Sequence, residues 1–312
     1  MKSAQINKYG GSEVVVINQN TPTPEVIAGK VLVEVYAAGI NPADWKVRVG
    51  YWQEKMPLQF PATLGGDFSG VILEVGEGVS DFKKGDEVYG QASLFSGGSG
   101  AFAEMALADA KHIALKPKKV NWLQAAALPL AAVSAYQALI DHMNLSSGQK
   151  ILLHGGAGGI GSFAIQLAKH LGADVATTAG ANDLEYVKSL GAKIIIDYQK
   201  QSFTELIKDY DAVFDTVGGE TYKKSFAILR KGGIIVSMLE SPNQELMNKY
   251  GVKAISQFTR ATSEFLSKLA ELVDRGAIKV MIDKVFSLDQ AGDALDYLEK
   301  SHTRGKVALQ VK

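Results

Sequence analysis

The 312-residue sequence contains no cysteine. Without cysteine the chain can form no disulfide, no thiolate nucleophile, no iron–sulfur centre and no thiolate zinc site. Net charge is also absent, because 33 Lys and Arg residues balance 33 Asp and Glu residues. A neutral chain has no general electrostatic attraction to nucleic acid or to an anionic membrane surface.

Long apolar runs are missing as well. A typical one, AAALPLAAV at 125–133, is far shorter than the roughly 20 residues that a membrane-spanning helix needs. The first residues, MKSAQINKYGG, lack the apolar region of a secretory signal. We therefore expect a cytoplasmic protein with a small-molecule substrate, and no nucleic acid or membrane as partner.

The length fits two domains of ordinary size, and the sequence pattern changes near residue 122. Residues 1–122 read as half-buried strands and turns, for example KVLVEVYA at 30–37. From 123 onward strand-like runs alternate with helical ones, which predicts a parallel sheet covered on both faces. We predict a mainly β domain over 1–122, completed by 281–312, and a doubly wound α/β domain over 123–280.

A glycine-rich turn follows the buried strand predicted at 151–155. The sequence GGAGGIG (155–161) satisfies G-x-G-x-x-G and opens a predicted helix. Such glycines allow a tight turn, close approach of backbone to a pyrophosphate, and close packing of helix on strand. The helix N-terminus offers free N–H groups to phosphates. We predict a dinucleotide site here, the alternative being a purely structural turn. Its contacts would be Gly156, Ala157, Gly158, Gly159, Ile160 and Gly161.

The next strand, ending in TTAGAN (177–182), bears on which dinucleotide binds. NAD sites usually carry Asp or Glu at this strand tip, to hold the ribose 2′-hydroxyl. No acidic residue stands at the tip, which favours NADP(H), and Thr178 could donate to the phosphate. However, no Lys or Arg stands there and Asp183 is close, so NAD(H) stays open. Thr178 is explained equally well as a β-branched strand residue.

Four longer segments are more specific than the glycine motif alone. They are AAGINPADWKVRVG (37–50), LGGDFSGVILEVG (64–76), AAALPLAAVSAYQAL (125–139) and GGAGGIGSFAIQLAKHLGA (155–173). In them, and over nearly its whole length, the chain resembles the zinc-free quinone oxidoreductase branch of the medium-chain dehydrogenase/reductase superfamily. The resemblance implies a GroES-like catalytic domain beside a Rossmann domain, and a homodimer.

Zinc-dependent alcohol dehydrogenases of this superfamily bind metal through a Cys and a Gly-His-Glu sequence. Here Asn41 stands in place of that Cys, and Gly65-Gly66-Asp67 in place of Gly-His-Glu. The five histidines show no metal-pair spacing and are predicted to be surface or capping residues. We therefore predict no metal ligand and no zinc. Without a Lewis acid, the reaction suits acceptors that take hydride readily, such as quinones and conjugated enones.

On the substrate side, the resemblance implies that Asn41 lies near the nicotinamide and the acceptor, where its amide can bond the substrate oxygen. Bacterial relatives place tyrosines around the quinone, at positions that are Lys46 and Trp52 here. Tyr51 and Trp52 could stack on a flat acceptor. The alternatives are a turn Asn before Pro42 and ordinary loop aromatics. We expect the final proton to come from water, because the sequence shows no obvious buried acid.

On the cofactor side, the resemblance implies contacts from residues that end strands or lie on the helix before the glycine turn. Ligands of open α/β sheets bind outside the carboxyl ends of the strands. Each of these residues also has an ordinary structural explanation. The predicted contacts are Ser134, Tyr198, Thr216, Val217, Met238 and Lys306.

Taken together, these features predict a zinc-independent NAD(P)H:quinone oxidoreductase. An NADPH-dependent enone or 2-alkenal reductase differs from it only in the acceptor. A non-catalytic NADP(H)-binding sensor or structural protein on the same fold is the alternative from another class. A short-chain dehydrogenase is disfavoured, because Tyr51 and Lys55 of the Tyr-x-x-x-Lys match precede the glycines. A serine hydrolase is disfavoured by the lack of G-x-S-x-G.

Overall fold

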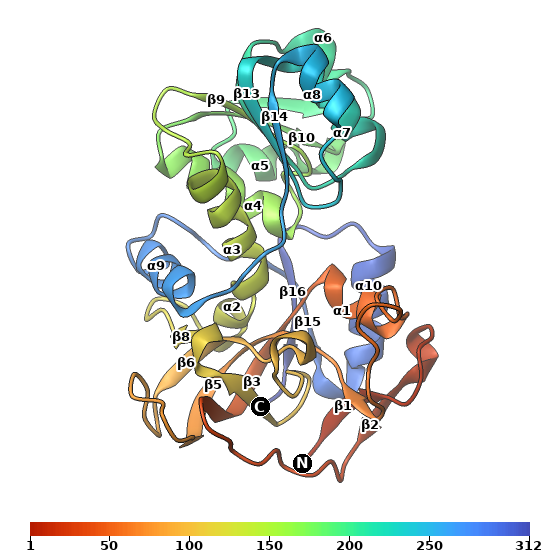
Figure 1. The fold of residues 1–312 in the computed structure, drawn as a ribbon, viewed down its shortest axis with the longest axis vertical. Helices are drawn as coiled ribbons and strands as arrows, with labels where there is room; N and C mark the ends of the chain where they lie inside the picture. Colours follow the sequence, from red (N-terminus) through yellow and green to blue (C-terminus); the bar gives the residue numbers. More distant parts are fainter. The chain divides into compact units, whose positions relative to one another are not determined.

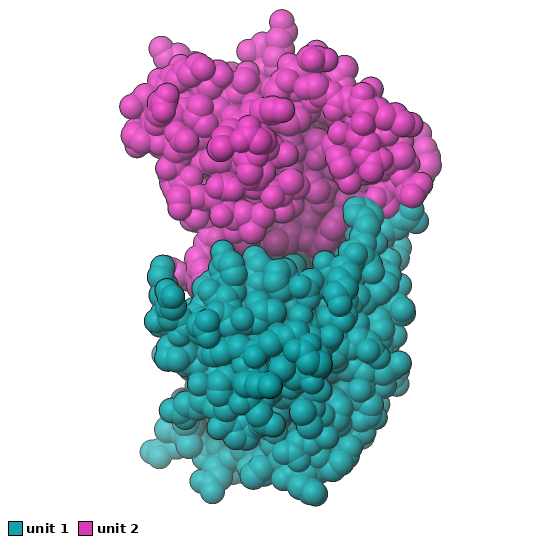
Figure 2. All heavy atoms as spheres, turned by 90° about the vertical axis from the view of Figure 1, so that its right-hand side faces the viewer, with its two compact units in different colours: residues 1–133, 261–275, 280–312 teal, residues 134–260, 276–279 magenta.

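The computed structural model describes all 312 residues and divides the chain into two compact units, drawn as a ribbon in Figure 1 and coloured separately in Figure 2. Unit 1 contains residues 1–133, 261–275 and 280–312, and unit 2 contains residues 134–260 and 276–279. The predicted fold class is confirmed, because unit 1 is mainly β and unit 2 holds a parallel sheet with helices.

Unit 1 is built on a seven-stranded sheet of order β15-β16-β3-β5-β6-β8, with β7 also paired to β3. The long central strand β3 buries Val31, Val33 and Val35 on one face, following the two-residue period of a strand. The strands are β3 (Lys30–Ile40), β5 (Asp67–Val75), β6 (Glu87–Gln91), β7 (Met105–Asp109), β8 (Ile113–Leu115), β15 (Ile282–Ser287) and β16 (Lys306–Gln310).

A three-stranded sheet of order β2-β1-β4 and several helices complete unit 1. The strands are β1 (Ser3–Ile6), β2 (Val15–Asn18) and β4 (Ala62–Thr63). The helices are α1 (Pro42–Arg48), α2 (Trp122–Ala126), α9 (Ser263–Asp274) and α10 (Ala291–Lys300). Helix α3 (Pro129–Tyr136) begins in unit 1 and continues into unit 2, where it is followed by a π-helical turn at Gln137–His142.

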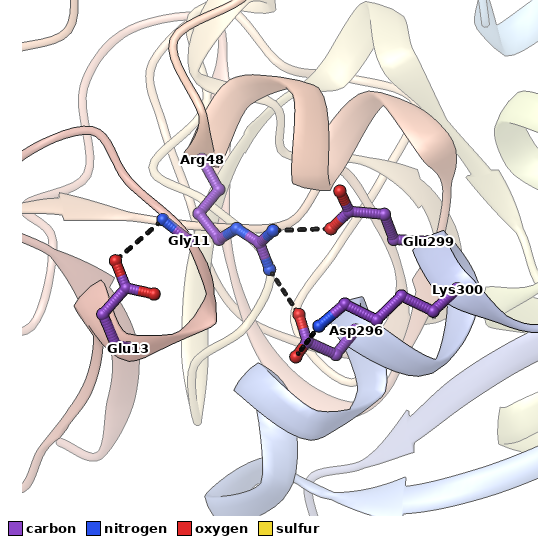
Figure 3. Close-up of polar contacts among 6 residues, drawn as sticks. All are labelled: Gly11, Glu13, Arg48, Asp296, Glu299 and Lys300. Atoms are coloured by element: carbon purple, nitrogen blue, oxygen red, sulfur yellow. Dashed lines mark hydrogen bonds and ion pairs between the residues drawn. The ribbon is translucent and has the colours of Figure 1, made fainter.

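The last residue of α1, Arg48, fastens this helix to α10 (Figure 3). Its side chain is 2% exposed, and it donates to Asp296 at 3.2 Å and to Glu299 at 2.7 Å. Its backbone carbonyl accepts from Gly10 N at 3.1 Å. A buried guanidinium needs such partners, because an unpaired buried charge is strongly destabilising. The pairs therefore hold α1, the helix that separates Asn41 from Tyr51 and Trp52, the substrate-side residues predicted from the sequence.

Unit 2 contains a six-stranded parallel sheet of order β11-β10-β9-β12-β13-β14. Counted from β9, this is the order 3-2-1-4-5-6 of dinucleotide-binding Rossmann domains. The strands are β9 (Lys150–Leu153), β10 (Asp174–Ala179), β11 (Ile194–Asp197), β12 (Tyr210–Asp215), β13 (Leu229–Ser237) and β14 (Lys253–Ser256).

Helices connect these strands. Helices α4 and α5 contact each other and strands β9 to β11, whereas α7 and α8 contact β12 and β13 (Figure 1). The helices are α4 (Gly159–His170), α5 (Leu184–Leu190), α6 (Phe203–Leu206), α7 (Gly219–Ser225) and α8 (Gln244–Tyr250). Across both units, no helix has the length and apolar character required to cross a membrane.

Candidate cofactor and substrate sites

The glycine-rich turn in unit 2 has the geometry that its sequence predicts. Gly155 adopts a left-handed φ of +70°, which glycine reaches without strain. A Cβ on Gly156 would lie 2.1 Å from Thr177 Oγ1, and one on Gly161 would lie 2.2 Å from the Gly155 carbonyl oxygen. Side chains at these two positions would therefore force the strand, turn and helix apart.

Gly158 has a different reason to lack a side chain. It is the N-cap of α4, and a Cβ there would meet only the Gly155 carbonyl oxygen, at 3.4 Å. No side chain caps the helix, so the N–H groups of its first turn have no side-chain acceptor. Free N–H groups at a helix N-terminus bind anions such as a pyrophosphate. The turn thus has both the space and the donors that a dinucleotide requires.

At the tip of β10, Gly180 lies near two side chains. A Cβ built on Gly180 would be 3.7 Å from the Tyr198 hydroxyl and 3.7 Å from a carboxylate oxygen of Asp183. Tyr198 is exposed, whereas Asp183 is buried. Thr178 is buried beneath the turn, where its hydroxyl accepts from Gly155 N at 3.3 Å. Tyr198 is therefore open to a ligand, and the Thr178 hydroxyl is already engaged inside the protein.

The carboxyl ends of β12 and β13 are joined by a buried carboxylate. Asp215 accepts from Val217 N at 3.0 Å, from Gly218 N at 2.9 Å and from Ser237 Oγ at 2.6 Å. These bonds fix the turns that follow the two strands. They place Thr216, Val217 and Met238 at the carboxyl edge of the sheet, where the sequence predicted cofactor contacts.

Ser134 and Gln257 lie together in unit 2. Ser134 Oγ is 2.7 Å from Thr259 Oγ1, and Gln257 Nε2 donates to the Ser134 carbonyl at 2.9 Å. Gln257 follows β14 and is 5% exposed, yet its Oε1 has no hydrogen-bond partner. A buried acceptor without a donor costs free energy unless a ligand satisfies it. Sequence reasoning did not identify Gln257, because no motif marks it.

One histidine departs from the sequence-based expectation. His154 is buried in the core of unit 2, so its prediction as a surface or capping residue is wrong. Its ring nitrogens are 3.1 Å from Thr178 Oγ1 and 2.9 Å from Ser225 Oγ, and its ring packs edge-on against Phe203. Burial lowers the pKa of His154 to about 4. It is therefore a neutral structural residue near pH 7.

Unit 1 contains a buried polar cluster around Asn41. Asn41 Nδ2 donates to Asp67 Oδ2 at 2.9 Å, and its Oδ1 accepts from the Lys306 ammonium group. Asp67 also accepts from Gln91 Nε2 at 2.8 Å and from Leu130 N at 2.9 Å. Lys306 donates further to the Ile40 carbonyl at 2.8 Å. These bonds fix the orientation of the Asn41 amide and leave one of its N–H hydrogens uncommitted.

Three ionisable groups share this cluster, so the expectation that no acid is buried here is wrong. Burial is the largest influence on the pKa of each group, because it disfavours the charged form. It raises the pKa of Asp44 to about 7 and raises the pKa of Asp67. It lowers the pKa of Lys306, while the charges of Asp67 and Asp44 oppose that change. Asp44 accepts from Asn41 N at 2.7 Å and so joins the cluster to the start of α1.

An exposed aromatic group follows α1. Tyr51 and Trp52 meet edge to face with their ring centroids 5.3 Å apart, and Trp52 meets Phe95 in the same way at 6.1 Å. The Lys46 ammonium lies 5.4 Å from the Tyr51 ring centroid. Phe95 belongs to a 3-10 helix (Leu94–Ser96) distant in sequence, and sequence reasoning did not find it. This group offers flat faces and one cation to a ligand.

Two family models match the chain. The alcohol dehydrogenase GroES-like domain covers residues 27–118, and the zinc-binding dehydrogenase domain covers residues 190–309. Among curated proteins, the 2-methylene-furan-3-one reductase of Solanum lycopersicum is 37% identical over 99% of this chain and 79% of its own length. The NADPH-dependent alkenal/one oxidoreductase of Arabidopsis thaliana is 36% identical, with the same two coverages.

Solved structures extend the similarity to the whole fold. The quinone oxidoreductase from Coxiella burnetii is 34% identical with a TM-score of 0.92, over 100% of this chain and 99% of that one. The Escherichia coli quinone oxidoreductase complexed with NADPH is 28% identical with a TM-score of 0.89, over the full length of both chains.

Fold and site thus define a two-domain nucleotide-binding protein with a Rossmann unit and a GroES-like unit. The chain belongs to the quinone oxidoreductase branch of the medium-chain dehydrogenase/reductase superfamily.

The name of the second family model raises the question of zinc, and the residues of the Asn41 cluster do not fit that metal. Zinc sites in proteins use thiolate, imidazole and carboxylate ligands. The cluster supplies an amide from Asn41 and the carboxylates of Asp44 and Asp67, but Asp44 accepts from Asn41 N and the Lys306 ammonium already bonds the amide oxygen. Nowhere in the chain are three or more His, Cys, Asp or Glu side chains grouped as a metal would require.

Proposed function

We propose that this protein is an NADPH-dependent oxidoreductase that transfers hydride from the nicotinamide to a quinone. The observation that carries the proposal is the glycine turn of residues 155–161, which has an uncapped helix end and no space for side chains at Gly156 and Gly161. Bound NADPH supplies the hydride. The backbone of the turn binds the pyrophosphate, and the unpartnered Gln257 Oε1 accepts from the carboxamide of the nicotinamide.

NADPH is the preferred cofactor in this proposal. The tip of β10 carries Gly180 and the exposed Tyr198 hydroxyl, both of which leave room for a 2′-phosphate. An NAD site would present an exposed carboxylate to the ribose, whereas Asp183 is buried. The similar E. coli quinone oxidoreductase was solved with NADPH.

The acceptor binds unit 1 residues. The exposed rings of Tyr51 and Phe95 and the half-buried ring of Trp52 stack on a flat quinone. The free N–H of Asn41 donates to an acceptor oxygen, and the buried cluster keeps this amide from rotating. Fixing a donor in this way favours reaction because less ordering remains to be done in the transition state.

Reduction of an enone is the second candidate. Lys46 stands where bacterial quinone reductases carry a tyrosine, and its ammonium near Tyr51 could pair with a single carbonyl oxygen. Two similar proteins are named as enone-type reductases, at 37% and 36% identity. The chemistry is the same, because hydride again goes to an electron-poor atom of a conjugated carbonyl system, and a proton from water then neutralises the resulting anion.

A steady-state assay tests the proposal. NADPH or NADH oxidation is followed at 340 nm, with a chelator, using an ortho-quinone and a short alkenone in parallel. Faster turnover of the quinone with NADPH supports the main proposal, and faster turnover of the alkenone moves the assignment to enone reduction. Binding of NADPH without reduction of either would reject catalysis. We also propose a homodimer, which sedimentation velocity at assay concentration would detect.

A further inference from the structure

A cavity lies in unit 2, at the edge of the sheet opposite to the glycine turn. It has a volume of about 550 Å³, within the range of small-molecule sites. Its walls include Lys150, Asp174, Ile194 and Tyr210, which are the first residues of the adjacent strands β9, β10, β11 and β12. The glycine turn follows the carboxyl end of β9, so this cavity is separate from the proposed cofactor site.

The floor of the cavity is apolar. Val175, Ile207 and Tyr210 are buried in it. The side chains of Ile194 and Leu206 are 46% and 53% exposed, so they present apolar surface to solvent. Covering exposed apolar surface with a ligand is favourable, because it removes that surface from water.

The rim carries positive charge. Three lysines, Lys150, Lys193 and Lys208, face a single acidic residue, Asp174, whose carboxylate is paired with Lys193. The nearby Asp211 carboxylate forms an ion pair with Arg230, whose Nε lies 2.6 Å from Asp211 Oδ1. Lys208 forms no ion pair or side-chain hydrogen bond. The lining therefore carries two net positive charges beside an apolar floor.

We propose that this cavity binds a small organic anion with an apolar body, such as an aromatic carboxylate. The apolar floor covers the ring, and the ammonium groups of Lys150 and Lys208 pair with the carboxylate. Neither the reaction nor the cofactor site proposed above requires this cavity. The inference therefore stands or fails independently of the proposed function.

The probe for the test is 2-naphthoate, with 2-naphthamide as its uncharged counterpart. Calorimetric titrations are run with saturating NADP⁺, so that the cofactor site is filled. We expect one molar equivalent of naphthoate to bind, and the amide to bind more weakly. Lys208→Gln should weaken naphthoate binding roughly two- to five-fold, as for a partly exposed ion pair. Lys150→Gln combined with Lys208→Gln should weaken it about ten-fold or more.

Leu206→Asn should also weaken binding, because it removes part of the apolar floor. Leu206 and Lys208 are exposed, so neither change threatens folding. The matched control is Lys224→Gln, which removes an exposed lysine of α7 outside the cavity and should leave the affinity unchanged. The proposal is overturned if naphthoate does not bind, if naphthamide binds as tightly, or if Lys208→Gln behaves like Lys224→Gln. A dimer that Leu206→Asn dissociates would also overturn it, by making this face a contact between copies.

Discussion

The ammonium group of Lys306 donates to the side-chain oxygen of Asn41, although 265 positions separate the two residues in the sequence. Asn41 caps the start of α1, and Lys306 begins β16, the strand paired with β3. The same amide donates to Asp67, so a buried lysine and a buried aspartate hold its two ends. This arrangement sets the direction of the one N–H that the proposed reaction needs.

Replacing Lys306 with Met should destabilise unit 1, because it leaves the buried Asp67 carboxylate without a compensating charge. Breaking a buried pair of this kind costs about 3–5 kcal/mol. All three tryptophans, Trp45, Trp52 and Trp122, belong to unit 1, so tryptophan fluorescence during urea unfolding reports on this unit alone. Lys312→Met, which breaks an exposed pair with Glu34, should leave the unfolding midpoint unchanged.

A double variant separates charge from packing in this cluster. Adding Asp67→Asn to Lys306→Met removes the uncompensated charge and should restore part of the lost stability. Losses that simply add would show that Lys306 and Asp67 are not coupled, and would contradict the account given for the cluster.

Asp44 should make the stability of unit 1 depend on pH. Its pKa of about 7 in the folded protein lies above the ordinary value of 3.8. The folded state thus keeps a proton that the unfolded state releases, and this contribution to stability falls as the pH rises from about 4 to about 7. Relative to wild type, Asp44→Asn should therefore gain stability between pH 5 and pH 7.

The comparison of the two proteins cancels the titrations of groups outside the cluster. His154, with its pKa lowered to about 4, contributes stability that rises with pH up to its ordinary range, and it does so in both proteins. Urea midpoints from tryptophan fluorescence at pH 5, 6, 7 and 8 give the difference directly. A constant difference across this range would show that Asp44 is already ionised in the folded state.

Replacing two glycines of the turn with alanine should have different effects, one on stability and the other on NADPH binding. Gly161→Ala places a Cβ 2.2 Å from the Gly155 carbonyl oxygen, so it should lower the melting temperature of unit 2. Gly158→Ala meets nothing closer than 3.4 Å and should fold normally. It should nevertheless weaken NADPH binding about ten-fold or more, because its methyl group lies where the pyrophosphate approaches. Circular dichroism and NADPH fluorescence titration measure the two effects. Normal NADPH affinity in Gly158→Ala would place the phosphates elsewhere.

The aromatic side chains of Tyr51, Trp52 and Phe95 should determine how tightly the acceptor binds, and should not affect binding of the cofactor. Trp52→Ala should lower kcat/KM for an ortho-quinone about two- to ten-fold, in line with the loss of an aromatic contact. Phe95→Ala should act in the same direction, and Trp52→Phe should retain most of the activity. The dissociation constant for NADPH should not change. An equal loss with Trp52→Phe and Trp52→Ala would argue against stacking.

The fold and the glycine turn could be predicted from the sequence because both depend on neighbouring residues. Strand and helix periods showed the α/β class, and the spacing of Gly156, Gly158 and Gly161 marked the turn together with its strand and helix. The predicted Tyr198 lies beside Gly180 at the strand tip, because the parallel strands β10 and β11 are adjacent and end at the same edge.

The buried cluster could not be predicted, because its members come from segments far apart in the chain. Nothing in the local pattern shows that Lys306 will meet Asn41, or that Phe95 will meet Trp52. His154 shows the same difficulty. A polar residue at a strand end is usually placed at the surface, but Thr178 and Ser225 supply the hydrogen bonds that allow this one to be buried.

The most direct test of the central claim is a single-turnover experiment with NADPH that carries deuterium at C4 of the nicotinamide. Protein in molar excess over the labelled NADPH is mixed with chelator and an ortho-quinone in a stopped-flow instrument, and the loss of absorbance at 340 nm is recorded. Direct hydride transfer predicts slower oxidation when one face of C4 is deuterated and no change when the other face is. Equal rates for both labelled cofactors, or no oxidation despite bound NADPH, would contradict the proposed reaction.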